Sequence, residues 1–163
     1  MSLSRTLLLA ACTILITSAA NAQAPQTERN VSMAMAQAII AGAMEQCTKD
    51  GYKVSVVIVD KAGLVAASLR GDGTKPHTME FARMKAYTSR TRGQTSLEFM
   101  QASSTPEGAL LRRIPGVVAI GGGVPIKIGD EIIGAVGVSG APGGEKDEVC
   151  AKAGIAKVAD GLR

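Results

Sequence analysis

The chain of 163 residues has very few aromatic side chains and a single histidine. Its aromatic residues are Tyr52, Phe81, Tyr87 and Phe99, and tryptophan is absent. This scarcity argues against the aromatic stacking platforms that bind single-stranded nucleic acid. One histidine, His77, also excludes a zinc or iron site built from several imidazoles.

A strong charge of one sign and long apolar runs are lacking as well. The 18 basic and 14 acidic side chains give a formal net charge of +4. Arg112 and Arg113 form the one basic pair, which is more typical of a solvated helix end than of a nucleic-acid patch. We therefore expect no nucleic-acid partner and no membrane span. With 46% apolar and 20% charged residues, the chain has the composition of one globular domain.

Residues 1–22 have the pattern of a signal peptide. Arg5 supplies a basic start, residues 7–17 form an apolar run too short to span a membrane, and residues 20–22 read Ala-Asn-Ala, a cleavage pattern. A lipoprotein box ending at Cys12 is the alternative, but Cys12 follows a very short apolar stretch. We expect a periplasmic or secreted protein with a flexible leader over 23–30 and a single domain over 31–163.

Two cysteines, Cys47 and Cys150, remain after such a cleavage. Because exported proteins meet an oxidising environment, the pair suggests one disulfide. Two buried free thiols stay open as the alternative, since spacing alone does not establish pairing.

Hydrophobic periodicity and turn residues predict an α+β fold. Expected helices cover 31–50, 76–91, 95–102 and 145–162, and expected strands cover 54–60, 64–70, 117–120, 124–128 and 131–139. The β-branched run at 54–60 is typical of a central strand covered on both faces. Strands joined as hairpins predict an antiparallel sheet with helices packed on it. The absence of regular β-α-β alternation argues against a dinucleotide-binding sheet.

Glycine-rich segments are the first candidates for a ligand site. Residues 137–147 run from a strand through a loop into a helix, and backbone amides ahead of a helix can hold an anion. The segment fits neither a P-loop nor a G-x-S-x-G elbow, so it predicts no phosphate-binding loop and no serine hydrolase. A tight turn that lets the last helix pack is the alternative. The candidate ligand loop comprises Gly122, Gly123, Pro125, Ser139 and Gly140.

His77 is the candidate metal ligand. It follows Pro76 at an expected helix start, whose positive end favours the neutral imidazole that ligates iron. Haem needs only one or two axial ligands, so one histidine suffices. Met79 and Met84 are candidate second ligands, although methionines more often fill cores. Lys85, on the same helix, would bind the carboxylates of such a ligand. The alternative for His77 is a surface or capping residue, and the alternative for Lys85 is a solvated helix face.

Two long segments together resemble a known family. They are VSVVIVDKAGLVAASLRGDGTKPHTMEFARMKAYTS and IGGGVPIKIGDEIIGAVGVSGAPGGEKDEVCAKAG, and they resemble the GlcG/HbpS-like haem-binding family over residues 31–161. The resemblance implies a profilin-like fold, with one five-stranded antiparallel sheet flanked by helices on both faces. It also implies a homo-oligomer, from dimer to octamer, and haem binding by some members for sensing or storage.

The leading hypothesis is therefore an exported haem-binding protein with no clear catalytic site. His77 would be the axial ligand, Met79 or Met84 a second ligand, and Lys85 the partner of the haem propionates. Two alternatives remain. One is a small-acid-binding protein or enzyme accessory that uses the glycine-rich loops, and the other is a structural oligomer without a ligand.

Overall fold

The structure is a computed structural model that describes residues 25–163, so the expected signal peptide lies outside the described residues. Most element bounds differ from the expected ones by a residue or two. In chain order the elements are α1 (Met33–Lys49), β1 (Ser55–Asp60), β2 (Val65–Arg70), α2 (Thr78–Arg92), α3 (Ser96–Ala102), η1 (Ala109–Arg113), β3 (Gly123–Ile128), β4 (Glu131–Ser139), α4 (Gly144–Ala156) and η2 (Ala159–Leu162).

The described strands form one antiparallel sheet with the order β2-β1-β4-β3. The first five residues of β1, Ser55 to Val59, are buried, as the β-branched run predicted for a central strand. Val56 and Ile58 are fully buried, and burying such a side chain stabilises the fold by about 1.5–3 kcal/mol. The antiparallel α+β prediction is confirmed.

The expectation of five strands is wrong, because residues 117–120 do not join the four-stranded sheet. Thr88 of α2 provides the physical reason. Its hydroxyl accepts from the Val118 N–H at 2.9 Å and donates to the Met84 carbonyl at 2.8 Å, while the Val118 carbonyl lies at a longer 3.3 Å. The Val117 N–H donates to the Ile114 carbonyl at 3.2 Å. Because α2 and the preceding turn occupy the N–H groups of Val117 and Val118, the segment is an extended connection into β3.

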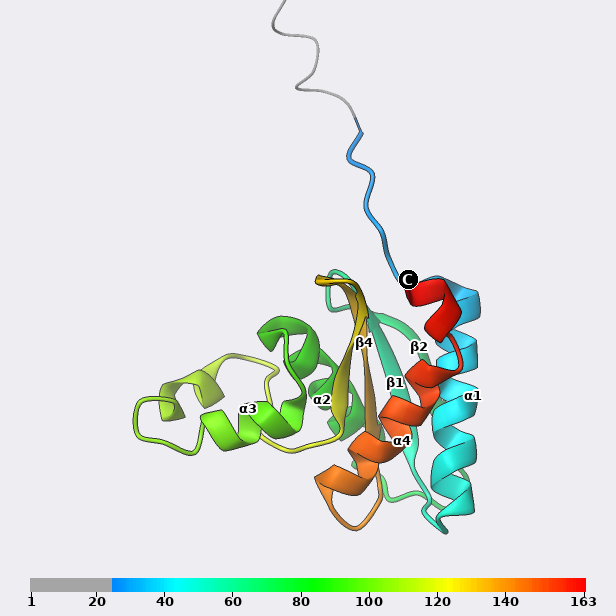
Figure 1. The fold of residues 1–163 in the computed structure, drawn as a ribbon. Coiled ribbons are helices and arrows are strands. Elements are labelled where there is room, and N and C mark those ends of the chain that lie inside the picture. The colour runs from blue at the N-terminus through cyan, green and yellow to red at the C-terminus, as the bar shows by residue number, and fades with distance from the viewer. Residues whose placement is uncertain (1–24) are drawn as a thin grey trace, which may run out of the picture.

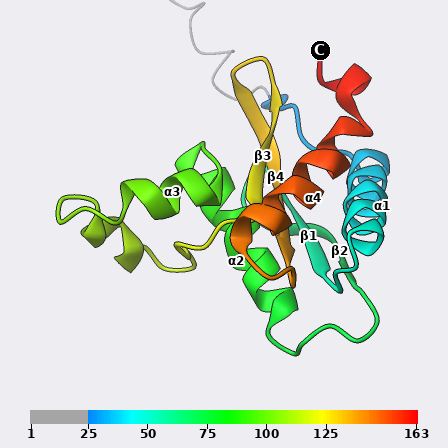
Figure 2. The same cartoon turned by 60° about the horizontal axis from the view of Figure 1, so that its bottom comes forward.

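Helices cover both faces of the sheet, as expected. In Figure 1, α1 and α4 lie on one side of the strands, and α2 lies on the other side with α3 beyond it. Figure 2 shows the chain after α3 extending away from the sheet. The larger apolar core lies under α1 and α4 and includes Ile39, Val56 and Ile126. A smaller core under α2 is built from Val57, Val59, Ala82, Ala86 and Ala135.

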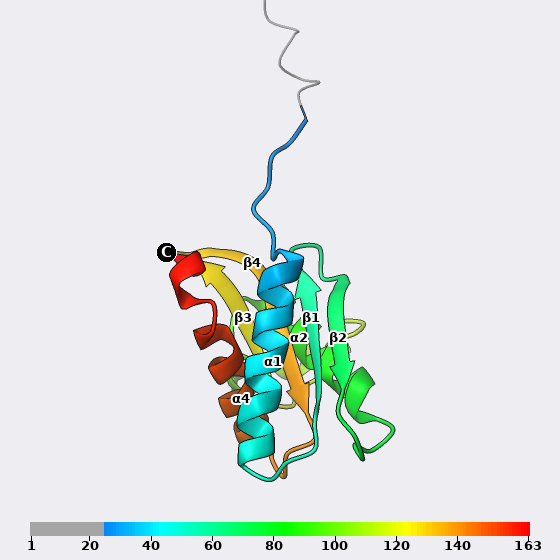
Figure 3. The same cartoon turned by 90° about the vertical axis from the view of Figure 1, so that its right-hand side faces the viewer.

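The first and last long helices pack side by side in opposite directions (Figure 3). Their contact is close because a Cβ on Gly154 of α4 would overlap the Ile39 carbonyl of α1. Cys47 and Cys150 form a disulfide across this contact, with their Cα atoms 5.5 Å apart and a sequence separation of 103. The bridge therefore joins the two ends of the domain.

The last helix ends earlier than expected. We predicted one helix over 145–162, whereas α4 ends at Ala156 and η2 follows. The Lys157 N–H donates to the Gly154 carbonyl and the Val158 N–H to the Ile155 carbonyl, so the chain tightens at this point. Among the described residues, no helix is long and apolar enough to cross a membrane.

Candidate functional site

A cavity of about 270 Å³ lies where β4 ends, α4 begins and the first half of α2 packs across them. It brings together His77, Lys85, Ser139 and Gly140, four of the residues singled out in the sequence. Its lining comprises Lys75, His77, Thr78, Phe81, Lys85, Ile120, Ser139, Gly140, Ala141, Gly143, Gly144 and Asp147.

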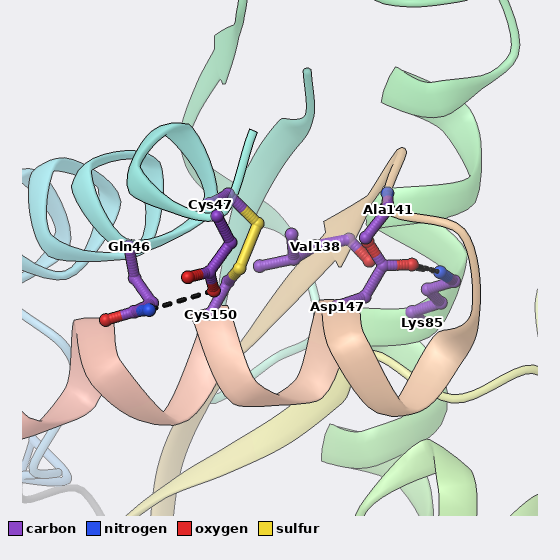
Figure 4. Close-up of a disulfide and its surroundings, with 8 residues drawn as sticks. Gln46, Cys47, Lys85, Val138, Ala141, Asp147 and Cys150 are labelled. Atoms are coloured by element: carbon purple, nitrogen blue, oxygen red, sulfur yellow. Dashed lines mark hydrogen bonds and ion pairs between the residues drawn. A yellow bond between two sulfur atoms is a disulfide. The ribbon is translucent and has the colours of Figure 1, made fainter. Parts of the chain in front are cut away.

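Lys85 and Asp147 form a buried ion pair beside this cavity (Figure 4). The Lys85 Nζ lies 2.7 Å from Asp147 Oδ2, and each side chain is 3% exposed. Lys85 Nζ also donates to the Val138 carbonyl at 3.1 Å, while Asp147 Oδ1 accepts from the Ala141 N–H at 2.9 Å. The pair thus connects α2, the end of β4, the β4–α4 loop and α4.

Burial has the largest influence on the pKa of the Asp147 carboxyl. It raises the pKa of the Asp147 carboxyl above its usual value, while the charge and hydrogen bond of Lys85 act in the opposite direction. The Ala141 N–H likewise favours the ionised carboxylate.

The ion pair changes the role expected for Lys85. We expected its ammonium to bind the carboxylates of a ligand, but the structure gives that ammonium a buried acidic partner. Lys75 is the exposed basic side chain that lines the cavity instead. It lies just before α2, and its carbonyl accepts from the Thr78 hydroxyl at 2.9 Å.

His77 stands at the N-cap of α2, and its side chain makes no hydrogen bond to the helix that it caps. The residue is exposed at the cavity. Its ring packs edge-on against Phe81, with ring centres 5.5 Å apart and planes at 82°. Contact with Phe81 restricts the imidazole without occupying its nitrogens, so the ring can accept a ligand.

The β4–α4 loop forms the opposite wall. Gly140 and Gly143 have φ values of 140° and 133°, in the left-handed half of conformational space, where side chains other than glycine are strained. Gly143 is also the N-cap of α4, and no side chain caps this helix. Within the described residues the Gly144 and Glu145 amides have no hydrogen-bond partner, whereas the Ala141 N–H donates to Asp147 and the Gly143 N–H donates to the Ala141 carbonyl.

Five other candidates lie outside the cavity lining. Met79 is half-buried against the smaller core, and Met84 is half-buried further along α2. A Cβ on Gly123 would overlap the Lys85 carbonyl, so this glycine lets α2 approach the sheet closely. Gly122 lies against Asp147 and Val138, and Pro125 pairs with Ala135 in the β3–β4 ladder.

Sequence reasoning missed Asp147, Lys75 and Phe81 as cavity residues. The helical periodicity of the segment that forms α4 did contain a signal for Asp147. Asp147, Cys150, Ala151 and Gly154 recur on one buried face of α4, which marks Asp147 as a buried acid in need of a partner. No comparable signal in the sequence marks Lys75. Within residues 25–163, no cluster of three or more histidine, cysteine or acidic side chains is arranged for a metal ion.

Comparison with known proteins supplies the family. Residues 31–156 match the family described as "Haem degrading protein HbpS-like". The chain belongs to the HbpS-like family. Protein GlcG of Escherichia coli (strain K12), a relative of this HbpS-like chain, is 32% identical over 114 residues, which cover 70% of this chain and 84% of GlcG. The expected family is therefore confirmed.

Two solved structures extend the likeness of this HbpS-like protein. A double mutant of HbpS from Streptomyces reticuli superposes with a TM-score of 0.79 at 31% identity, covering 86% of this chain and 94% of that one. A complex of PduOC with haem superposes with a TM-score of 0.71 at 25% identity, covering 78% of this chain and 94% of that one. A relative of similar fold is thus described as holding haem.

Proposed function

We propose that this HbpS-like protein is an exported haem-binding protein, of the sensing or storage type, with His77 as an axial ligand of the iron. The observation that carries the proposal is the exposed His77 imidazole at a cavity, with no hydrogen bond to its own helix. Family membership and the haem complex of PduOC support haem as the ligand.

The chemistry of the lining fits axial ligation by one residue. His77 offers an imidazole nitrogen, and Phe81 restricts the ring. Haem, when bound, supplies an iron centre that accepts a further ligand or an electron. Neither Met79 nor Met84 lines the cavity, so the described lining favours His77 as the single strong protein ligand.

The size of the cavity limits how much of a haem one chain covers. A volume of about 270 Å³ lies just below the range of about 300–1,000 Å³ that is usual for small-molecule pockets. A cavity of this size would not enclose a whole porphyrin. A second copy of the chain would cover the rest of it, which accords with the homo-oligomer expected from the family resemblance. Light scattering with and without haem tests this assembly.

Export is proposed on two supports. The first is the expected signal peptide over residues 1–22. The second is the Cys47–Cys150 disulfide, because such bridges persist in oxidising compartments.

The test is an absorbance titration of the mature protein with haem, run beside His77→Ala. We expect a saturable Soret shift in the unmodified protein and its loss in His77→Ala. Added imidazole should restore the spectrum of the variant, because free imidazole can replace the missing ligand. Met33→Ala, an exposed change on α1, serves as the matched control. An unchanged spectrum in His77→Ala would refute the assignment of the ligand.

A further inference from the structure

Ser139 is a buried residue whose hydroxyl opens onto the cavity. It is 5% exposed and lines the cavity, and its Oγ makes no hydrogen bond to another described residue. Its neighbour across the β1–β4 ladder, Ser55, differs in this respect, since its Oγ lies 2.8 Å from the Thr78 hydroxyl. The Ser139 Oγ is not one of the fully buried side-chain atoms that lack a partner, so it is open to the cavity, and a ligand there can accept its hydrogen bond.

Two positively polarised groups line the same cavity. The first is the N-terminus of α4, a 13-residue helix whose N-cap, Gly143, provides no side-chain cap. The second is Lys75, an exposed basic residue of the lining. Lys85 and Asp147 also line the cavity, but they neutralise each other. The charge balance of the lining is therefore positive.

We propose that this cavity is a binding site for a single carboxylate group, held by the Ser139 hydroxyl, the first backbone amides of α4 and the Lys75 ammonium. A carboxylate accepts several hydrogen bonds on two oxygens, which matches a hydroxyl and adjacent amides on one wall. This inference goes beyond the haem proposal and does not depend on iron ligation by His77. The carboxylate belongs either to a small free acid or to a propionate of haem.

One charge opposes such a ligand. The Glu145 carboxylate, in the first turn of α4, lies against Gly143 at the rim of the site. Removing this charge should strengthen binding of an anion, whereas a neutral ligand would be indifferent to it. Glu145→Gln therefore tests the charge of the ligand.

The experiment is a titration of the mature protein with propionate, followed by ligand-observed NMR, with propionamide as the neutral probe. We expect saturable binding of propionate and none of propionamide. Ser139→Ala and Lys75→Gln should each weaken propionate binding by about tenfold. Glu145→Gln should strengthen it. Ser68→Ala and Lys127→Gln, exposed changes outside the cavity lining, are the matched controls and should leave it unchanged.

A second arm separates the two sources of the carboxylate. Haem and its dimethyl ester, which lacks free carboxylates, are titrated against the unmodified protein, His77→Ala and Ser139→Ala. If the source is a propionate of haem, the unmodified protein prefers haem over the ester and Ser139→Ala loses that preference. If the source is a free acid, propionate binds but haem and its ester bind alike.

If His77→Ala loses iron ligation but still binds propionate, the carboxylate site is independent of the proposed iron ligand. Propionate binding that is equal in Ser139→Ala, Lys75→Gln and the unmodified protein would overturn the proposal. The proposal would also be overturned if the unmodified protein neither bound propionate nor preferred haem over its ester.

Discussion

The Lys85 ammonium and the Asp147 carboxylate lie 2.7 Å apart, each almost fully buried, and link the helix that carries His77 to the helix that forms the opposite wall of the cavity. Buried pairs of this kind contribute little net stability over an apolar replacement, but removing one partner leaves an uncompensated charge. The pair therefore matters chiefly for the relative position of α2, the β4–α4 loop and α4.

Removing one member of this pair should destabilise the protein. We expect Lys85→Met to lower the free energy of unfolding by about 3–5 kcal/mol, because Asp147 would remain buried without its partner. The double variant Lys85→Met/Asp147→Asn should recover part of that loss. Urea unfolding of Lys85→Met, Asp147→Asn and the double variant measures the coupling. A double variant as unstable as the sum of the two single variants would show that the residues are not coupled.

The disulfide should stabilise the domain by constraining its unfolded chain. It joins two residues with a sequence separation of 103. For a loop of that length, the chain-entropy model predicts a stabilisation of about 4–5 kcal/mol. We expect Cys47→Ser/Cys150→Ser to lose about that much free energy of unfolding in guanidinium titrations. Reduction of the unmodified protein should cause a similar loss. If reduction leaves the unfolding midpoint where it was, the two sulfurs do not constrain the chain.

Close contact between α1 and α4 should make Gly154 intolerant of a side chain. In Gly154→Ala the new Cβ would overlap the Ile39 carbonyl and lie 3.1 Å from the Ala43 Cβ. We expect a loss of about 1–3 kcal/mol in the free energy of unfolding, as is usual for overpacked sites. Gly161→Ala is the matched control, since its Cβ would meet no atom within 4 Å. Equal stability of the two variants would contradict the close packing.

Glu131 begins β4, at the end of that strand opposite the cavity. Its contribution to the free energy of unfolding should depend on pH. Its carboxylate lies 2.8 Å from Lys61 Nζ and 3.0 Å from Arg29 Nε. The hydrogen bond from Lys61 is the main cause that lowers the pKa of Glu131 below its usual value of 4.5. A lowered folded-state pKa means that this stability is present above pH 4.5 and is lost as the pH falls through the folded-state pKa.

Glu131→Gln measures this contribution. The difference in unfolding free energy between the unmodified protein and the variant should favour the unmodified protein near neutral pH and shrink on acidification. A difference that does not change with pH would show that the ion pairs of Glu131 do not survive in solution.

Local patterns in the sequence predicted much of the fold. The β-branched run of β1 and the hydrophobic periodicity of the helices are short-range signals, and the elements that they predict are present. The expected strand over 117–120 failed because Thr88, 30 residues away, takes up the N–H of Val118. Hydrophobic patterning gives no information about such a distant side chain.

The cavity was predictable in part. His77, Ser139 and Gly140 were candidates because of residue type and the glycine-rich loop, and they do lie together. Lys75 and Phe81 were not, since nothing local marks them. The partner of Lys85 also depends on how α2 and α4 pack over the sheet, which periodicity within one helix does not determine.

The most direct test of the haem proposal is a crystal structure of the haem-loaded protein, with the iron located by its anomalous signal. We predict iron within bonding distance of an imidazole nitrogen of His77, with the haem edge at the cavity beside Ser139 and Lys75. Iron bound elsewhere on the chain, with His77 free, would contradict the proposed site.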